Sequence, residues 1–469
     1  MTESPLMLSV SGLRGIVGAS LTPPVAARYA AAVGRWMIEQ TGRPDPKIVV
    51  GRDSRPSGQM FEHAAIAGLI SVGCRVASLG IASTPGVAVM IRQLDCDGAM
   101  VITASHNPII WNGIKTLAPP GVAPSADQAA RIIELFHEGD VPGADVSRLQ
   151  PVTHADNVEA VHSQLILEHI NVKAIQQAKL KVVLDSVHGA GGPEAMVMLD
   201  ALGVEVLQLY GEPTGQFPRP PEPVKDQLGE LCQVVTEHHA AAGFAQDPDA
   251  DRLAVVDETG RYIGEEYTLV LAAMHLLDRA KTGAGVGMAA QPENAVVAAN
   301  LSTSRMIDDV AAAAGAEVVR TKVGEANVAQ AMQNRHAVCG GEGNGGIIWP
   351  RISLVRDSLV GIALTLEMLA LRDVKLSTIV DQTPAYAMIK DKVALADAGI
   401  VMSDIGPCLR DYFTRPDFDE QDGVRLDWPD RWVHVRASNT EPILRVIAEA
   451  PTEPDARALV NDVRAALGL

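Results

Sequence analysis

Short apolar runs alternate with helix-like stretches through the first part of this chain. The segment Pro24–Gln40 carries small apolar residues at helical spacing, and Lys47–Val50 is an apolar run of strand length. Two more apolar runs, Val76–Leu79 and Gly98–Ile102, flank a second helical segment at Gly86–Gln93. Strands that alternate with helices in this way favour a parallel sheet covered by helices.

The same alternation restarts twice and then stops. A second cycle begins with the apolar run Lys181–Leu184, and a third begins after Asp257. Each cycle has the length of an ordinary domain. Near the C-terminus, Trp432–Val435 and Ile443–Ala448 instead have the pattern of adjacent strands in an antiparallel sheet. The pattern therefore predicts three α/β domains and a fourth domain of different fold.

Composition narrows the class of protein. With 469 residues the chain exceeds the size at which one hydrophobic core keeps growing, so several domains are expected. Hydrophobic residues make up 47% and aromatic residues only 4%, so the cores must be built from Ala, Val, Leu and Ile. The 39 Lys and Arg against 57 Asp and Glu leave a net charge of −18, which argues against nucleic acid or an anionic membrane as a partner.

Cysteine usage and the N-terminal sequence indicate the cellular compartment of the protein. The five cysteines are scattered without a Cys-x-x-Cys spacing, so neither a disulfide framework nor a zinc site is indicated. The segment Met1–Val10 lacks the charged and apolar regions of a signal peptide. No apolar run reaches the roughly 18 residues of a membrane helix. We therefore expect a cytoplasmic protein.

The segment Asp247–Arg252, with the sequence DPDADR, places three carboxylates on alternate residues between apolar runs at Ala241–Ala245 and Leu253–Val256. Carboxylate oxygens on a tight loop suit a hard divalent cation such as Mg²⁺. An EF-hand loop also begins with alternating Asp, but it requires Gly at the sixth position and helical flanks, whereas Arg252 stands there. A solvated acidic turn remains open on this motif alone.

Thr103–Pro108, with the sequence TASHNP, directly follows a predicted buried strand. Ser105 then lies where α/β proteins place their ligands, at the carboxyl end of a parallel strand. No Gly-x-Ser-x-Gly elbow surrounds it, which argues against an ordinary serine hydrolase. A local turn or helix cap is the alternative for this serine.

A glycine-rich segment, Gly340–Gly346, lets the backbone approach a ligand closely. Its only side chains with hydrogen-bonding groups are those of Glu342 and Asn344, which could bracket vicinal hydroxyls of a sugar. The alternative is a glycine-rich turn without a ligand.

The segment Arg436–Arg445 has the sequence RASNTEPILR. Two arginines with hydroxyl and amide donors between them suit a phosphate dianion, because guanidinium groups pair bidentately with phosphate oxygens. A solvated hairpin turn is the alternative.

Taken in order, these segments resemble the four signature loops of the α-D-phosphohexomutase superfamily over nearly the whole chain. Thr103–Pro108 resembles its phosphoserine loop, Asp247–Arg252 its metal loop, Gly341–Gly346 its sugar loop and Arg436–Arg445 its phosphate loop. Chance agreement at four ordered sites is very improbable, so the resemblance weakens all four alternatives together.

The resemblance implies three related mixed α/β domains plus a C-terminal α+β domain of the TATA-box-binding-protein-like type, around a central cleft. The expected boundaries are 1–153 for the domain with the phosphoserine loop, 154–257 for the metal loop, 258–373 for the sugar loop and 374–469 for the phosphate-binding domain. Two further segments, Ser9–Gly15 and Asn112–Lys115, also resemble family segments.

The resemblance also implies a mutase that interconverts hexose 6-phosphate and hexose 1-phosphate. Ser105 would carry a phosphoryl group, and Asp247, Asp249 and Asp251 would hold one Mg²⁺ that also binds an oxygen at Ser105. The phosphorylated serine would give its group to a hexose monophosphate. The resulting 1,6-bisphosphate would turn over in the cleft and return its other phosphate. A hexose 1,6-bisphosphate is accordingly expected as activator.

The other matching residues receive roles from the same resemblance. Arg14, Arg252 and Lys115 would stabilise charge at the reacting phosphoryl group, and Lys115 or His106 would carry the proton. The substrate-binding residues would be Glu342 and Asn344 at the sugar hydroxyls, and Arg436, Ser438, Asn439, Thr440 and Arg445 at the phosphate that does not react.

One departure leaves the acid/base assignment open. Several family branches end the sugar loop in Ser-Gly-His, whereas this chain has Asn344-Gly345-Gly346. With Val323–Asn327 upstream, the loop is most similar to phosphoglucosamine mutases and to archaeal phosphomannomutase/phosphoglucomutases. We expect phosphoglucosamine mutase activity. A phosphomannomutase/phosphoglucomutase activity of broad specificity is the alternative. A catalytically silent sugar-phosphate-binding relative and a metal-dependent phosphatase are alternatives of another class. The sequence does not identify the preferred sugar, the pathway or the oligomeric state. A homodimer is one of the possible states.

Overall fold

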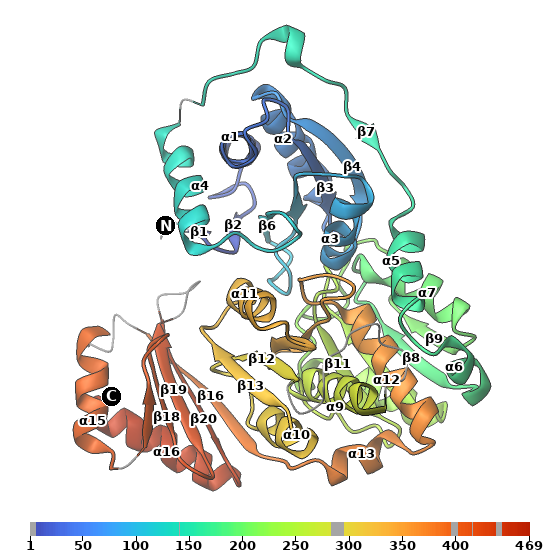
Figure 1. The fold of residues 1–469 in the computed structure, drawn as a ribbon, viewed down its shortest axis with the longest axis vertical. Coiled ribbons are helices and arrows are strands. Elements are labelled where there is room, and N and C mark those ends of the chain that lie inside the picture. The colour runs from blue at the N-terminus through green and yellow to red at the C-terminus, as the bar shows by residue number, and fades with distance from the viewer. Residues whose placement is uncertain (1–5, 140, 283–294, 395–401, 415, 438–442) are drawn as a thin grey trace.

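The computed structural model describes residues 6–139, 141–282, 295–394, 402–414, 416–437 and 443–469. Within these ranges the chain forms four sheets, one after another in sequence, each with its own helices (Figure 1). The two apolar runs near the C-terminus are adjacent antiparallel strands, as predicted. The domain boundaries expected from the sequence remain predictions.

The first sheet has the strand order β1-β2-β6-β5-β3-β4-β7. Its strands are β1 (Met7–Ser9), β2 (Gly12–Ile16), β3 (Lys47–Arg52), β4 (Arg75–Ile81), β5 (Gly98–Ile102), β6 (Trp111–Leu117) and β7 (Thr153–His154), and its helices are α1 (Pro23–Thr41), α2 (Gly58–Ser71), α3 (Thr84–Gln93) and α4 (Ala126–Glu138). Alternate residues of a strand face opposite sides of the sheet. Ile48 and Val50 therefore pack against α1 and α2, while Val49 packs against α3.

The second sheet has the order β11-β10-β8-β9, and the third has the order β15-β14-β12-β13. The second contains β8 (Lys181–Asp185), β9 (Glu205–Leu209), β10 (Ala242–Gln246) and β11 (Leu253–Asp257), with α5 (Val158–Leu167), α6 (Val172–Ala178), α7 (Gly191–Ala201) and α8 (Gly229–Glu237). The third contains β12 (Val296–Asn300), β13 (Glu317–Thr321), β14 (Cys339–Glu342) and β15 (Gly346–Ile348), with α9 (Tyr267–Thr282), α10 (Met306–Ala314), α11 (Glu325–Arg335), α12 (Ser358–Arg372) and α13 (Leu376–Gln382).

The same four-strand unit recurs in the first three sheets. In each unit three strands are parallel and a fourth returns antiparallel at one side, as β6 does beside β5, β11 beside β10 and β15 beside β14. These are the mixed α/β sheets that the family resemblance implied. The apolar pattern alone favoured parallel strands, because the pattern of a buried strand does not encode its direction. The phosphoserine, metal and sugar loops occupy this same connection, between the third strand and the returning fourth.

The fourth sheet is antiparallel throughout, with the order β16-β20-β19-β18-β17. Its elements are β16 (Ala387–Ala394), β17 (Asp417–Asp419), β18 (Val424–Asp427), β19 (Trp432–Ala437), β20 (Ile443–Ala450), α15 (Ile405–Tyr412) and α16 (Glu453–Ala466). Leu459, Val460 and Val463 of α16 pack on the sheet. Short 3₁₀ turns at Val146–Arg148, Lys225–Gln227 and Met402–Asp404 complete the described elements. Among the helices of the described ranges, none has the length and apolarity that a bilayer crossing demands.

Candidate active site

The phosphoserine loop and the metal loop meet at Ser105. Its Oγ donates a hydrogen bond to Asp247 Oδ2 at 2.7 Å, across the junction of the first two sheets. The side chain is 2% exposed, and its backbone φ of +48° lies in the left-handed region. Ala250, in the metal loop, has a φ of +55°. Such strained backbone persists only where the surrounding structure enforces it, and it clusters at functional sites.

Arg55 holds the phosphoserine loop in this conformation, and no role was predicted for it. Its Nη2 donates to the carbonyl oxygens of Ser105 and Asn107, both at 2.6 Å. Its Nη1 donates to the carbonyls of Pro108 and Trp111 at 2.9 and 3.0 Å. The guanidinium is buried against the Asp53 carboxylate, with Nε 3.1 Å from Oδ2. Arg55 therefore fixes the position of the serine through the backbone.

Arg55→Met should destabilise the protein by about 3 to 5 kcal/mol, because it leaves Asp53 as an uncompensated buried charge. Urea titration should show the unfolding midpoint shifted to lower concentration. Arg75→Met is the matched control, since Arg75 and Asp45 of the same domain form an exposed ion pair that contributes at most about 1 kcal/mol. Equal midpoints for the two variants would contradict the scaffold role of Arg55.

The three carboxylates of the metal loop, Asp247, Asp249 and Asp251, are fully buried, and one oxygen from each lies within 4.8 Å of the others. Asp249 Oδ1 and Asp251 Oδ1 have no hydrogen-bond partner among the described residues. Burial, reinforced by the charges of Asp249 and Asp251, raises the pKa of Asp247 well above its usual range. A cluster of this kind, with oxygens free to coordinate, fits a hard divalent cation. The strands β10 and β11 flank the loop, so the EF-hand alternative is wrong.

Lys115 and Arg356 form ion pairs with two carboxylates of the metal loop. Lys115 Nζ lies 2.6 Å from Asp249 Oδ2 and 2.7 Å from Asp251 Oδ2. Although burial opposes the charged form, the two carboxylates raise the pKa of Lys115. Arg356 Nη2 lies 2.8 Å from Asp251 Oδ2. Lys115 is therefore a positionally fixed ammonium group. The Oδ2 atoms of Asp249 and Asp251 are already paired with cationic side chains.

The remaining predicted catalytic residues lie around Ser105. His106 Nδ1 is 3.3 Å from Ser105 Oγ. Burial, with the charges of Arg252 and Arg14, holds the pKa of His106 well below its usual range, so the ring is neutral. Arg14 Nη1 donates to Asn107 Oδ1 at 2.8 Å, while the backbone N–H of Arg252 donates to Asp247 Oδ1 at 3.1 Å.

The sugar loop is tied to the metal loop by Arg356. Its Nη1 donates to Glu342 Oε2 at 3.2 Å and to Asn344 Oδ1 at 3.3 Å. Glu342 Oε1 also accepts from Asn300 Nδ2 at 2.8 Å, so this carboxylate is firmly positioned. A Cβ added at Gly346 would lie 2.1 Å from Arg356 Cδ. The arginine thus fills the space that a histidine at position 346 would need.

The phosphate loop lies between β19 and β20. Arg436 and Arg445 are directly paired across these strands, an arrangement of like charges that costs stability unless an anion lies between them. Arg436 is buried, its Nε donates to no acceptor among the described residues, and its pKa is lowered by burial. The predicted residues Ser438, Asn439 and Thr440 lie outside the described residues.

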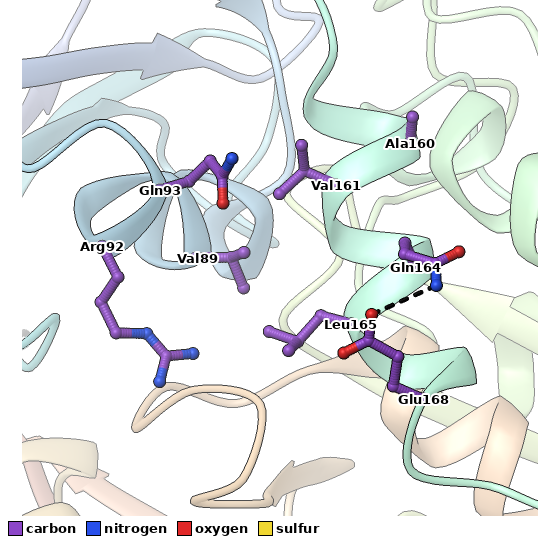
Figure 2. Close-up of a pocket in the computed structure, with 8 residues that line it drawn as sticks. All are labelled: Val89, Arg92, Gln93, Ala160, Val161, Gln164, Leu165 and Glu168. Atoms are coloured by element: carbon purple, nitrogen blue, oxygen red, sulfur yellow. Dashed lines mark hydrogen bonds between the residues drawn. The ribbon is translucent and has the colours of Figure 1, made fainter.

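An open groove elsewhere contains none of the predicted site residues. Figure 2 shows it between the facing helices α3 and α5. Its lining residues are Val89, Arg92, Gln93, Ala160, Val161, Gln164, Leu165 and Glu168.

The structure therefore brings together the predicted residues of the phosphoserine and metal loops, and joins the sugar loop to them. It adds Arg55, Arg356 and Thr84, whose Oγ1 donates to Asp249 Oδ2 at 2.6 Å. Only Arg55 had a signal in the sequence, as part of the polar segment Gly51–Gly58 that follows an apolar run.

Comparison with known families gives matches along nearly the whole chain. Models of the phosphoglucomutase/phosphomannomutase domains match in order: alpha/beta/alpha domain I at residues 7–142, domain II at 160–260, domain III at 265–386 and the C-terminal domain at 416–466.

Individual relatives extend over similar lengths. A phosphoglucomutase/phosphomannomutase of Thermococcus kodakarensis is 36% identical over 448 residues, 95% of either chain. A probable phosphoglucosamine mutase of Methanopyrus kandleri is 34% identical, over 96% of this chain and 95% of its own. The crystal structure of a phosphoglucomutase/phosphomannomutase family protein from Burkholderia thailandensis has a TM-score of 0.81 at 25% identity, covering 98% of both chains.

Proposed function

Because the chain belongs to the phosphoglucomutase/phosphomannomutase family, within the α-D-phosphohexomutase superfamily, we propose that it interconverts hexose 6-phosphate and hexose 1-phosphate through a phosphorylated Ser105. The observation that carries this proposal is the 2.7 Å contact of Ser105 Oγ with Asp247, inside a group of three buried carboxylates. Binding a sugar phosphate requires neither group, so their presence argues against a catalytically silent relative.

The reaction consists of two phosphoryl transfers. In the first, the free hydroxyl of a hexose monophosphate attacks the phosphorus on Ser105: a new O–P bond forms, the bond to Oγ breaks and the hydroxyl loses its proton. The 1,6-bisphosphate then turns over. In the second transfer, Ser105 Oγ attacks the other phosphate, and the isomeric monophosphate leaves after regaining a proton. Positioning and charge stabilisation supply nearly all the catalysis in such transfers.

We assign the proton transfer at this centre to His106. Its Nδ1 lies 3.3 Å from Ser105 Oγ, within reach of the oxygen that enters or leaves. Lys115 is held between two carboxylates and remains an ammonium, so its role is to balance charge.

Enzymes of this family depend on a metal ion, and we propose Mg²⁺ here. Asp247, Asp249 and Asp251 would hold it, because their oxygens match the preference of Mg²⁺ for hard ligands. When bound, the ion neutralises charge on the phosphoryl oxygens. Arg14 and Arg252 would stabilise charge at the reacting phosphoryl group. A hexose 1,6-bisphosphate would act as activator by phosphorylating Ser105.

Both orientations of the intermediate must fit one site, which requires a separate place for the phosphate that does not react. Arg436 and Arg445 would hold it, with Ser438, Asn439 and Thr440. Glu342 and Asn344 would hold the hydroxyls between the two phosphates, in positions fixed by Arg356.

Arg445→Ala should raise KM for the 1-phosphate and the 6-phosphate alike, with kcat little changed, since the lost contact is the same in ground and transition states. A charge-assisted contact worth about 2 to 3 kcal/mol corresponds to about a 30- to 150-fold rise. Steady-state kinetics in both directions measure this effect. Arg410→Ala, in an exposed ion pair of the same domain, should leave both KM values unchanged. Impairment in one direction only would contradict the turnover of the intermediate.

For the sugar we propose glucosamine phosphate first, with a broad phosphomannomutase/phosphoglucomutase activity as the alternative; the Methanopyrus kandleri relative supports the first and the Thermococcus kodakarensis relative the second. A panel of glucosamine, glucose and mannose monophosphates, with trace bisphosphate and Mg²⁺, tests the choice. Labelled phosphate should stay in the sugar pool; its release as inorganic phosphate would favour a phosphatase. The net charge of −18 supports neither nucleic acid nor an anionic membrane as partner, and we place the enzyme in the cytoplasm.

A further inference from the structure

His162 lies in α5, outside all four signature loops, and its side chain is fully buried. Its two ring nitrogens contact carboxylates from two different domains. Nδ1 lies 3.0 Å from Glu194 Oε2 in α7, and Nε2 lies 2.8 Å from Asp357 Oδ2 at the start of α12. The residue next to it, Val161, lines the groove of Figure 2, but His162 does not reach that groove.

The geometry favours a positively charged ring. A neutral imidazole has one donor and one acceptor nitrogen, and the acceptor would then face a carboxylate oxygen. Although burial favours the neutral ring, Asp357 and Glu194 raise the pKa of His162 to about 10. His162 is thus a buried cation that joins two buried anions, and removal of such a partner is strongly unfavourable.

Glu194 connects His162 to one side of the metal loop. Its Oε1 accepts from the backbone N–H of Ser83 at 2.8 Å, and its Oε2 accepts from Ser83 Oγ at 2.6 Å. The next residue is Thr84, whose Oγ1 donates to Asp249 Oδ2 at 2.6 Å and whose N–H donates to the Asp249 carbonyl at 2.9 Å. Glu194 therefore fixes the turn that holds Asp249.

Asp357 connects His162 to the other side. Its Oδ1 caps α12 by accepting from the N–H groups of Leu359 and Val360 at 2.9 and 3.2 Å. The preceding residue, Arg356, holds Asp251 at 2.8 Å. The following residue, Ser358, donates its N–H to the carbonyl of Ala250 at 3.1 Å. The residues on both sides of Asp357 thus contact the metal loop.

We propose that His162 is a positioning residue for the metal site: by linking Glu194 to Asp357 it sets the distance between the two supports that hold Asp249 and Asp251. The inference rests on the proposed function, since it assigns to those carboxylates the binding of a divalent cation. Residues that hydrogen-bond metal ligands directly typically change metal affinity or activity by about 10- to 100-fold when replaced, and His162 acts one contact further from the ligands.

The test uses His162→Gln, which keeps a polar side chain but cannot contact both carboxylates as a cation. Mn²⁺ serves as the probe, because it shares the preference of Mg²⁺ for oxygen ligands and its free concentration can be read by electron paramagnetic resonance. We expect the Kd for Mn²⁺ to rise by about 10-fold, the lower end of the range for direct partners of metal ligands, and kcat to fall by a similar factor. KM for the hexose phosphate should change less than the Kd for Mn²⁺, since His162 contacts no described residue of the phosphate loop.

His275→Gln is the matched control. His275 is also buried, with Nε2 2.7 Å from Glu367 Oε2, but within the described ranges no hydrogen bond or ion pair joins either residue to the metal loop or its supports. It should lower the melting temperature and leave the Kd for Mn²⁺ unchanged. If His162→Gln behaved in the same way, His162 would be a structural residue only and the inference would be overturned.

Asp357→Asn covers the case in which His162→Gln does not fold. Asparagine caps a helix as well as aspartate does, so α12 should keep its start while the charge facing His162 is lost. An unchanged Kd for Mn²⁺ in this variant would also overturn the inference. A wild-type protein without measurable affinity for Mn²⁺ would contradict the proposed metal site itself, and the inference with it.

Discussion

Ser105→Ala should lower mutase turnover to background in both directions, by several orders of magnitude. Under the proposed mechanism this oxygen carries the phosphoryl group that enters the product, and no other hydroxyl among the described residues donates a hydrogen bond to Asp247. Without the oxygen neither half-reaction can start. Intact mass and peptide mapping should find one phosphate on Ser105 of the purified wild-type protein and none on the variant.

Ser186→Ala is a suitable control for this prediction. Ser186 is also a fully buried serine, directly after strand β8, and its Oγ has no hydrogen-bond partner among the described residues. Its loss should leave turnover unchanged. Near-normal turnover of Ser105→Ala would exclude a covalent phosphoserine, whatever the state of the control.

Asp249→Asn should weaken metal binding and lower kcat by at least about 10³-fold, the size that follows from losing about 4 kcal/mol of transition-state stabilisation at the phosphoryl group. The amide keeps the shape of the side chain, and its oxygen can still accept from Thr84 or Lys115. It removes the negative charge of one of the three carboxylates proposed to hold the cation. For the wild type, EDTA should inactivate and excess Mg²⁺ should restore activity.

Asp257→Asn is the control that separates loss of metal binding from the general effect of removing a buried carboxylate. Asp257 is fully buried in the same sheet, at the end of β11 remote from the metal loop, where it accepts from Thr259 and Arg261. This variant should lose stability and keep its affinity for Mn²⁺. The metal assignment would have to be abandoned if Asp249→Asn kept both wild-type turnover and wild-type Mn²⁺ affinity.

The sequence predicted the residues whose signal is local. Ser105 and the three carboxylates stand in short polar segments between apolar runs, and the ends of buried strands are where such segments gather. Arg356 and His162 gave no such signal. Arg356 meets Asp251 across 105 positions of the chain, and His162 meets Asp357 across 195. Contacts of this range are set by how the domains pack, which no periodicity within one segment encodes.

Strand direction was the other gap. The runs at β5, β10 and their neighbours are apolar on both faces, so their pattern identifies burial and leaves open whether the next strand returns antiparallel. The apolar pattern therefore predicted which segments are polar loops. It did not predict that three of these loops follow the same strand of a repeated four-strand unit. The roles of Ser438, Asn439 and Thr440 are implied by the family resemblance and stay predictions.

The placement of three loops at one equivalent connection has a consequence for how such a protein diverges. Each loop is closed by strands of its own sheet, as β10 and β11 close the metal loop, so its side chains can change without altering the register of the other two sheets. A lineage descended from a triplicated unit could thus specialise one copy for the nucleophile, one for the cation and one for the sugar. Under the proposed assignment of the loops, selection on the sugar copy would change substrate choice while the transfer chemistry is inherited intact.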